Sequence, residues 1–130
     1  MIERIIGESI GERFLMSSFI AIITNKNNLP QALHQDQGIA PFQDAAAPYT
    51  CNTMFILDDM GPHNGGTLVV PGSHKLLSDP GTGQPVTTPM PPAINLSAPA
   101  GTVMIFEGRL LHGTGVNPVS YTHLTLPTMF

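Results

Sequence analysis

Turn-forming residues interrupt this sequence so often that long regular elements have no room. Thirteen glycines and thirteen prolines are spread over 130 residues. Between them lie short runs rich in β-branched and aromatic residues, and such runs bounded by turn residues are typical of β-strands. The expected strands lie within residues 14–24, 31–37, 49–57, 67–71, 93–96, 102–106 and 110–112.

The first residues carry a helical pattern instead. Isoleucines recur at positions 2, 5, 6 and 10 with charged residues between them, which predicts a short helix within residues 2–14. Two aperiodic stretches, 38–48 and 78–92, are expected to be surface loops. One short helix followed by many short strands indicates an all-β fold, a jelly roll or a related double-stranded barrel. A chain of this length has room for one such domain.

Charge and composition exclude several functions. The net charge is −4 and Lys and Arg together number five, so the basic face needed by nucleic acids or anionic membranes is missing. Cys51 is the single cysteine and cannot form an internal disulfide, so no oxidising compartment is implied. The sequence has neither an apolar run of about 18 residues nor a signal-peptide core. We therefore expect a cytoplasmic protein without a nucleic-acid or membrane partner.

His34 and Asp36 form the most informative short motif. In a strand, residues i and i+2 project from the same face, so an imidazole and a carboxylate can reach one metal ion. His112, which follows an apolar run much later in the chain, supplies a third candidate ligand. Two histidines and one carboxylate leave positions open on a metal, as in non-haem iron(II) oxygenases. A zinc site is more often built from three or four His and Cys ligands.

Other polar residues are better explained by structure than by chemistry. His63 and His74 lie in predicted turns, where a lone histidine is far more often solvated or bonded to backbone than a ligand. Asp58 and Asp59 end a predicted strand and are expected to lie in a solvated turn. Cys51 is expected to be a small buried hydrophobe.

Four segments carry a family resemblance: HQDQG at 34–38, NTMFILDDM at 52–60, NGGTLVVPGSHK at 64–75 and PAGTVMIFEGRLLHGTGVNP at 99–118. In this order they resemble the phytanoyl-CoA dioxygenase family, and the resemblance covers residues 1–118. It implies a double-stranded β-helix fold with iron(II), 2-oxoglutarate and O2 as cofactor and cosubstrates. It also implies hydroxylation of an unactivated C–H bond of a small organic substrate, with release of succinate and CO2.

The resemblance also assigns individual residues. His34, Asp36 and His112 fall on the family's iron ligands. Asn52 falls on a strand position that lies beside the cosubstrate. Thr114 falls where a small hydroxyl residue helps to hold the far carboxylate of 2-oxoglutarate.

The last twelve residues depart from the family. An arginine that pairs with the far carboxylate of 2-oxoglutarate is expected near Thr122 or His123, but Arg109 is the last arginine of the chain. Residues 119–130, VSYTHLTLPTMF, are unlike the family and resemble a translated sequencing adapter. We hypothesise that the natural protein continues differently after about Pro118, so that residues 1–118 are a partial oxygenase core followed by an atypical tail.

Two other functions are compatible with the sequence. One is a cupin-like barrel that binds a metal or small molecule without oxidative activity. Presence or absence of the downstream arginine in the intact gene discriminates this alternative from the oxygenase. The other is a sandwich-type interaction module in which His34, Asp36 and His112 are coincidental. That alternative predicts that the three side chains lie far apart in the folded chain.

Overall fold

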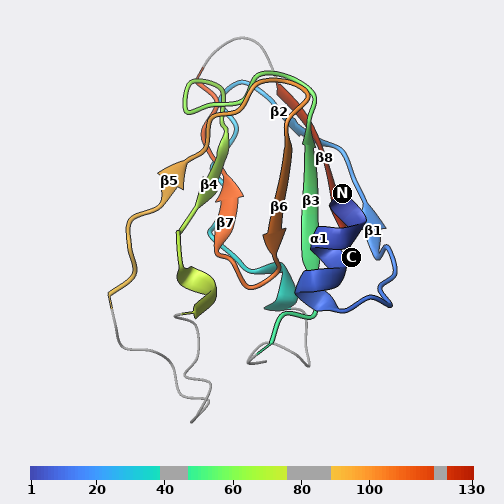
Figure 1. Cartoon of the computed structure of the whole chain (residues 1–130). Coiled ribbons are helices and arrows are strands. Elements are labelled where there is room, and N and C mark those ends of the chain that lie inside the picture. The colour runs from blue at the N-terminus through green and yellow to red at the C-terminus, as the bar shows by residue number, and fades with distance from the viewer. Residues whose placement is uncertain (39–46, 76–88, 119–122) are drawn as a thin grey trace.

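The fold consists of two antiparallel β-sheets facing each other, with one helix against the outside of the larger sheet (Figure 1). The computed structural model describes residues 1–38, 47–75, 89–118 and 123–130. Within these ranges the elements are α1 (Ile2–Ile10), β1 (Ser18–Phe19), β2 (Ile22–Thr24), η1 (Asp36–Gly38), β3 (Cys51–Ile56), β4 (Thr67–Val69), η2 (Ser73–Lys75), β5 (Ile94–Asn95), β6 (Val103–Glu107), β7 (His112–Thr114) and β8 (His123–Met129).

Strand β3 is the centre of the larger sheet, whose order is β1-β8-β3-β6, with β2 also paired to β8. Its neighbours β6 and β8 both run antiparallel to it. Ile56 is fully buried and packs with Met54 and Met60 in the hydrophobic core. The helix α1 contacts β3 and buries Ile6 completely. The strand β3 is therefore packed on both faces, which restricts the movement of its side chains.

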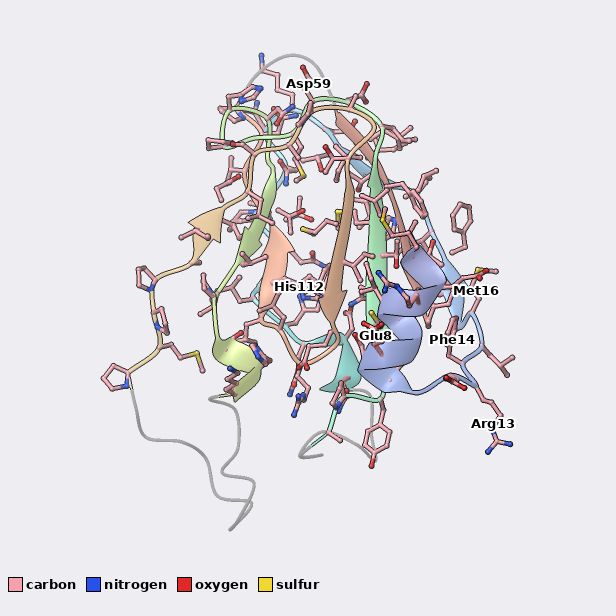
Figure 2. All side chains as sticks on the ribbon, viewed as in Figure 1. Glu8, Arg13, Phe14, Met16, Asp59 and His112 are labelled. Carbon is pink, nitrogen blue, oxygen red and sulfur yellow. The ribbon has the colours of Figure 1, made fainter. Side chains whose placement is uncertain are left out.

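The smaller sheet has the order β5-β4-β7. Its register places Thr67 opposite Thr114 and Val69 opposite His112. Because alternate residues of a strand share a face, His112 and Thr114 point to the same side of β7. Figure 2 places His112 between the two sheets.

The helix is shorter than residues 2–14, where the sequence predicts it. It ends at Ile10, and Gly11 follows with φ 100° while its N–H donates to Gly7 O. A positive φ is accessible to glycine at little cost, so Gly11 ends the helix. Within residues 14–24, strand structure is confined to the short strands β1 and β2.

The predicted strand at 31–37 is wrong. His34 makes an isolated antiparallel bridge to His112, and Asp36–Gly38 form a single turn of 3-10 helix. The predicted strand at 110–112 is displaced, since β7 begins at His112 and Leu110 N–H donates to Glu107 O in the preceding turn. His34 and Asp36 therefore do not share a face of one strand.

The predicted loops and the C-terminal tail have different outcomes. Most of 38–48 and 78–92 lies outside the described residues, so these two predictions stay open. Residues 123–129 form β8, which pairs with β3 from Asn52↔Met129 to Ile56↔Thr125. In the described part of the chain, no helix is long and apolar enough to cross a membrane.

Candidate metal centre

The two candidate histidines lie side by side across a backbone bridge. His34 N–H donates to His112 O and His112 N–H donates to His34 O, each at 3.0 Å. Directly opposed residues of an antiparallel bridge have neighbouring side chains. The two imidazole centroids are accordingly 4.6 Å apart. The bridge, rather than an i, i+2 relation along one strand, brings His34 to the site.

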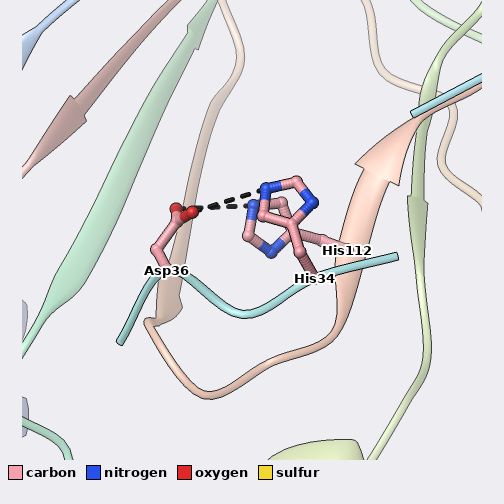
Figure 3. Close-up of side chains that lie close together, drawn as sticks. All are labelled: His34, Asp36 and His112. Carbon is pink, nitrogen blue, oxygen red and sulfur yellow. Dashed lines mark ion pairs between the residues drawn. The ribbon is translucent and has the colours of Figure 1, made fainter. Parts of the chain in front are cut away.

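Asp36 completes the cluster (Figure 3). Its Oδ1 lies 3.5 Å from His34 Nε2, and its Oδ2 lies 3.4 Å from His112 Nε2. One ligand atom from each of the three residues lies within 4.8 Å of the others, and within the described ranges this is the cluster that can hold a metal ion. The convergence contradicts the interaction-module alternative, which requires these side chains to lie apart.

Backbone carbonyls fix which imidazole nitrogen faces the centre. His34 Nδ1 lies 2.9 Å from Ala32 O, and His112 Nδ1 lies 2.9 Å from Leu110 O. A carbonyl only accepts hydrogen bonds, so each Nδ1 carries a proton and the Nε2 lone pair of a neutral ring points toward Asp36. This second hydrogen bond is the usual way in which a protein orients a metal-binding histidine.

Asn52, on the central strand β3, holds the carboxylate of Asp36. Its Nδ2 donates to Asp36 Oδ2 at 2.7 Å, and Asn52 is 4 % exposed. Burial raises the pKa of Asp36, but the hydrogen bond and charge of His112, the charge of His34 and the Asn52 hydrogen bond outweigh it. The pKa therefore lies below its ordinary value, and Asp36 is an anion at neutral pH.

His112 is the more enclosed histidine. Its side chain is 9 % exposed, against 37 % for His34, and the Phe106 ring packs edge-on against it at a centroid distance of 4.7 Å. Burial lowers the pKa of His112. The hydrogen bonds to Asp36 and to Leu110 O and the charge of Asp36 raise this pKa by a larger amount. The net result is a pKa above the ordinary value of an imidazole.

The three residues open onto a cavity of about 220 Å³ between the two sheets. Apart from His34, Asp36 and His112, its described lining is uncharged. Apolar walls come from Ile20, Ile22, Met54, Phe106 and Pro127, and polar groups come from Gln31, Asn52, Thr67 and Thr114. Mostly apolar walls with a few polar groups are usual for a small-molecule site.

Thr114 and Gln31 form one polar side of the cavity. Thr114 Oγ1 and Thr114 N–H both lie 3.3 Å from Gln31 Oε1, and Gln31 N–H donates to Thr114 O at 2.9 Å. Thr114 was predicted from the sequence as a site residue, whereas Gln31 and Phe106 were not. Nothing in their local sequence marks these two residues, because cross-strand packing places them at the cavity.

Three residues to which the sequence assigned no chemistry, Cys51, Asp58 and Asp59, make structural contacts. Cys51 is 1 % exposed. The exposed carboxylates of Asp58 and Asp59 accept hydrogen bonds from the N–H groups of Leu124 and Ala100. These are turn and strand-end contacts, as expected.

The donor set suits iron(II). Two neutral imidazoles and one carboxylate are the facial triad of non-haem iron(II) oxygenases, and the Nδ1 hydrogen bonds leave both Nε2 lone pairs aimed at one point. The single cysteine of the chain, Cys51, is buried and lies outside the cluster, so it is not a candidate ligand. The residues therefore fit iron(II) better than a structural zinc ion.

Among the curated proteins with related sequences are fungal dioxygenases. The chain is 34 % identical over 112 residues to dioxygenase af480 of Aspergillus fumigatus, covering 83 % of this chain and 34 % of that protein. It is 31 % identical over 111 residues to dioxygenase aneA of Aspergillus aculeatus, covering 80 % of this chain and 35 % of that protein. The chain thus spans about a third of the length of these curated relatives.

Solved structures share the fold. EvdMO1 matches with a TM-score of 0.72 at 23 % identity, covering 98 % of this chain and 30 % of that one. AviO1 from Streptomyces viridochromogenes matches with a TM-score of 0.67 at 27 % identity, covering 88 % of this chain and 49 % of that one. The epimerase SnoN, whose structure contains Fe3+ and alpha ketoglutarate, matches with a TM-score of 0.66 at 23 % identity, covering 88 % and 48 %. These matches confirm the predicted double-stranded β-helix fold.

The family model for phytanoyl-CoA dioxygenase matches residues 2–118. This range agrees with the resemblance read from the four sequence segments and includes His34, Asp36 and His112. Residues 119–130 lie outside it. The chain belongs to the phytanoyl-CoA dioxygenase family.

Proposed function

We propose that this chain carries the iron-binding core of a non-haem iron(II) and 2-oxoglutarate-dependent dioxygenase. The proposed reaction is hydroxylation of an unactivated C–H bond of a small organic substrate, with 2-oxoglutarate converted to succinate and CO2. The observation that supports it most directly is the convergence of His34, Asp36 and His112, whose ligand atoms lie within 4.8 Å of one another at a cavity. Membership of the family supports the same assignment.

The proposed ligands are His34 Nε2, His112 Nε2 and one oxygen of Asp36. Iron bound there, together with 2-oxoglutarate and O2, supplies an oxidant able to attack an unactivated C–H bond. The residues of the chain orient and shield this chemistry. Ala32 O and Leu110 O fix the imidazole rings by accepting their Nδ1–H groups.

The cavity walls have two proposed roles. Their apolar side chains exclude water from the reacting centre, which protects it from side reactions. Thr114 is assigned to the far carboxylate of 2-oxoglutarate, since its hydroxyl lines the cavity and its present bond to Gln31 is long at 3.3 Å. Asn52 lies beside the same cavity, but its amide already bonds Asp36, so we assign it to orienting that ligand.

An anaerobic titration tests the proposal. Purified protein is titrated with iron(II) and then with 2-oxoglutarate, while the weak visible charge-transfer band of the iron–keto-acid complex is followed. The proposal predicts a band in the unsubstituted chain and none in an Asp36→Ala variant. Absence of iron binding in the folded, unsubstituted chain rejects it.

The sequence favours one second candidate, a cupin-like metal-binding barrel without oxidative activity. The chain has no Lys or Arg after Arg109, and the described lining of the cavity offers no cation to the far carboxylate of a keto-acid. An arginine fork is the best partner for such a carboxylate. Iron binding that depends on Asp36, without a charge-transfer band, supports this candidate.

A further inference from the structure

We propose that Gln37 is a positioning residue of the metal centre, which fixes the segment carrying Asp36 against the start of β3. The inference rests on the proposed metal-binding function. Gln37 directly follows the candidate ligand Asp36 and is 2 % exposed. A buried carboxamide is kept in a fold when its polar groups are bonded, and those of Gln37 join two segments of the site.

The side chain of Gln37 bonds the backbone that leads into β3. Its Oε1 accepts a hydrogen bond from Tyr49 N–H at 2.8 Å, and its Nε2 donates to Ala47 O at 3.1 Å. Tyr49 lies three residues before Asn52, which in turn bonds Asp36 at 2.7 Å. Gln37–Tyr49 and Asn52–Asp36 are thus two links between the same pair of segments.

Sheet pairing does not provide this connection. In the described chain, β6 and β8 occupy the two sides of β3, so residues 36–38 are not its strand neighbour. The direct links between the Asp36 segment and β3 are therefore side-chain bonds, while the backbone bonds of His34 and Gln37 join the same segment to His112 and Gly108. Metal sites tolerate displacements of only about 0.5 Å in their ligands, so loss of one of the two links is expected to disturb the centre.

The turn between β6 and β7 is hydrogen-bonded to both Gln37 and Thr50. Gln37 N–H donates to Gly108 O at 3.0 Å, and Gly108 N–H donates to Thr50 O at 2.8 Å. A Cβ on Gly108 would collide with Thr50 Oγ1 and lie 3.3 Å from Gln37 Cβ. This turn leads to His112, so Gln37 contacts the segments that present His112 and Asn52 as well as Asp36.

Asn64 provides a matched control. It is also a fully buried carboxamide, whose Oδ1 accepts from Gly61 N–H at 2.9 Å and whose Nδ2 donates to Asp59 O at 2.7 Å. Figure 2 shows Asp59 at the end of the molecule away from His112. Replacement of either amide breaks a bond from a backbone N–H and a bond to a backbone carbonyl, but of the two residues it is Gln37 that adjoins a candidate metal ligand.

The experiment compares Gln37→Met with Asn64→Leu. Cobalt(II) serves as the probe, because its visible spectrum reports ligand geometry as well as binding. Dissociation constants are measured below the unfolding transitions of all the metal-free proteins. We expect both variants to unfold at lower temperature, but only Gln37→Met to bind cobalt(II) about 10- to 100-fold more weakly, with an altered spectrum.

The outcomes separate the two proposals. If the unsubstituted chain binds cobalt(II) tightly and Gln37→Met shows the same affinity and spectrum, the role of Gln37 is overturned while the metal-site function stands. An equal loss in Asn64→Leu overturns it too, because it shows a general effect of stability. If the unsubstituted chain does not bind cobalt(II), both the metal-site function and this inference are rejected. If Gln37→Met does not fold, Gln37→Asn keeps the amide but shortens its reach, and the same loss of affinity is expected.

Discussion

Asn52 Nδ2 donates a hydrogen bond to Asp36 Oδ2 at 2.7 Å, and this contact joins the central strand β3 to a candidate metal ligand. The bond restricts rotation of the carboxylate and occupies one lone pair of Oδ2. The other oxygen, Oδ1, faces His34 Nε2 at 3.5 Å. Asn52 thus favours coordination through one oxygen of Asp36 and stabilises the charged form that a metal requires.

Replacement of Asn52 by leucine should weaken metal binding without unfolding the protein. Leucine has a similar size but cannot donate a hydrogen bond, so the Asp36 carboxylate is free to rotate. Loss of such an outer contact typically lowers metal affinity by about 10- to 100-fold. Iron(II) dissociation constants from anaerobic titration measure the effect. Thr53→Val, a buried change on the opposite face of β3, is the control, and equal affinities in the two variants would contradict the role of Asn52.

Replacement of Asp36 by asparagine should abolish measurable iron binding. The substitution keeps the shape but removes the charge and leaves two imidazoles as ligands. Since loss of an outer contact already costs up to about 100-fold, loss of a ligand is expected to cost at least that much. Asp59→Asn removes the same charge at an exposed turn and should bind iron(II) normally. Iron binding of natural strength in Asp36→Asn excludes this residue as a ligand.

Replacement of Thr114 by valine should weaken binding of 2-oxoglutarate but not of iron(II). Valine removes the hydroxyl at nearly constant volume, and a hydrogen bond to a charged group contributes enough that its loss lowers affinity about tenfold or more. The charge-transfer band gives the 2-oxoglutarate affinity. Thr53→Val is the control, because Thr53 is a fully buried threonine of β3 that does not line the cavity. A normal affinity in Thr114→Val removes Thr114 from the cosubstrate site.

The candidate ligands could be named from the sequence, but the way they meet could not. His, Asp and His are recognisable because few residue types bind iron(II). His34 and Asp36 were predicted to share a face of one strand, and this was wrong, since the segment forms a bridge followed by a turn of 3-10 helix. What unites the site is the pairing of His34 with His112 and the bond from Asn52 to Asp36. Both depend on tertiary contacts between distant segments, which local patterns do not contain.

The C-terminal strand shows a different limit. Strand pairing uses backbone groups, so a segment of alternating leucine and threonine is compatible with a place beside β3 whatever its origin. Thr128 nevertheless lies opposite Thr53, and both hydroxyl oxygens are buried without a hydrogen-bond partner. Native folds have few such groups, so this threonine pair is an unfavourable contact between β8 and β3.

Replacement of Thr128 by valine should stabilise the protein. Thr128 is 3 % exposed, and an unbonded buried hydroxyl costs about 1–3 kcal/mol that an isosteric methyl group does not. We expect the free energy of unfolding to rise by about 1 kcal/mol, measured by urea denaturation. Ile56→Ala, at a fully buried core position, should lower it by about 2–5 kcal/mol. A destabilised Thr128→Val variant shows that the hydroxyl has a partner in solution.

Metal binding should weaken as the pH falls below neutrality. Burial lowers the pKa of His112, but its bonds to Asp36 and Leu110 O and the charge of Asp36 outweigh this and raise the pKa above that of a free imidazole. The metal-free protein therefore takes up a proton on His112 at a higher pH than a free imidazole does, and a metal must displace that proton, whereas Asp36, with its lowered pKa, stays ionised. Each proton displaced makes the apparent affinity fall about tenfold per pH unit below that pKa. Cobalt(II) titrations between about pH 6 and 8, repeated calorimetrically in two buffers of different ionisation enthalpy, count the protons released. An affinity independent of pH, with no proton release, contradicts His112 as a ligand.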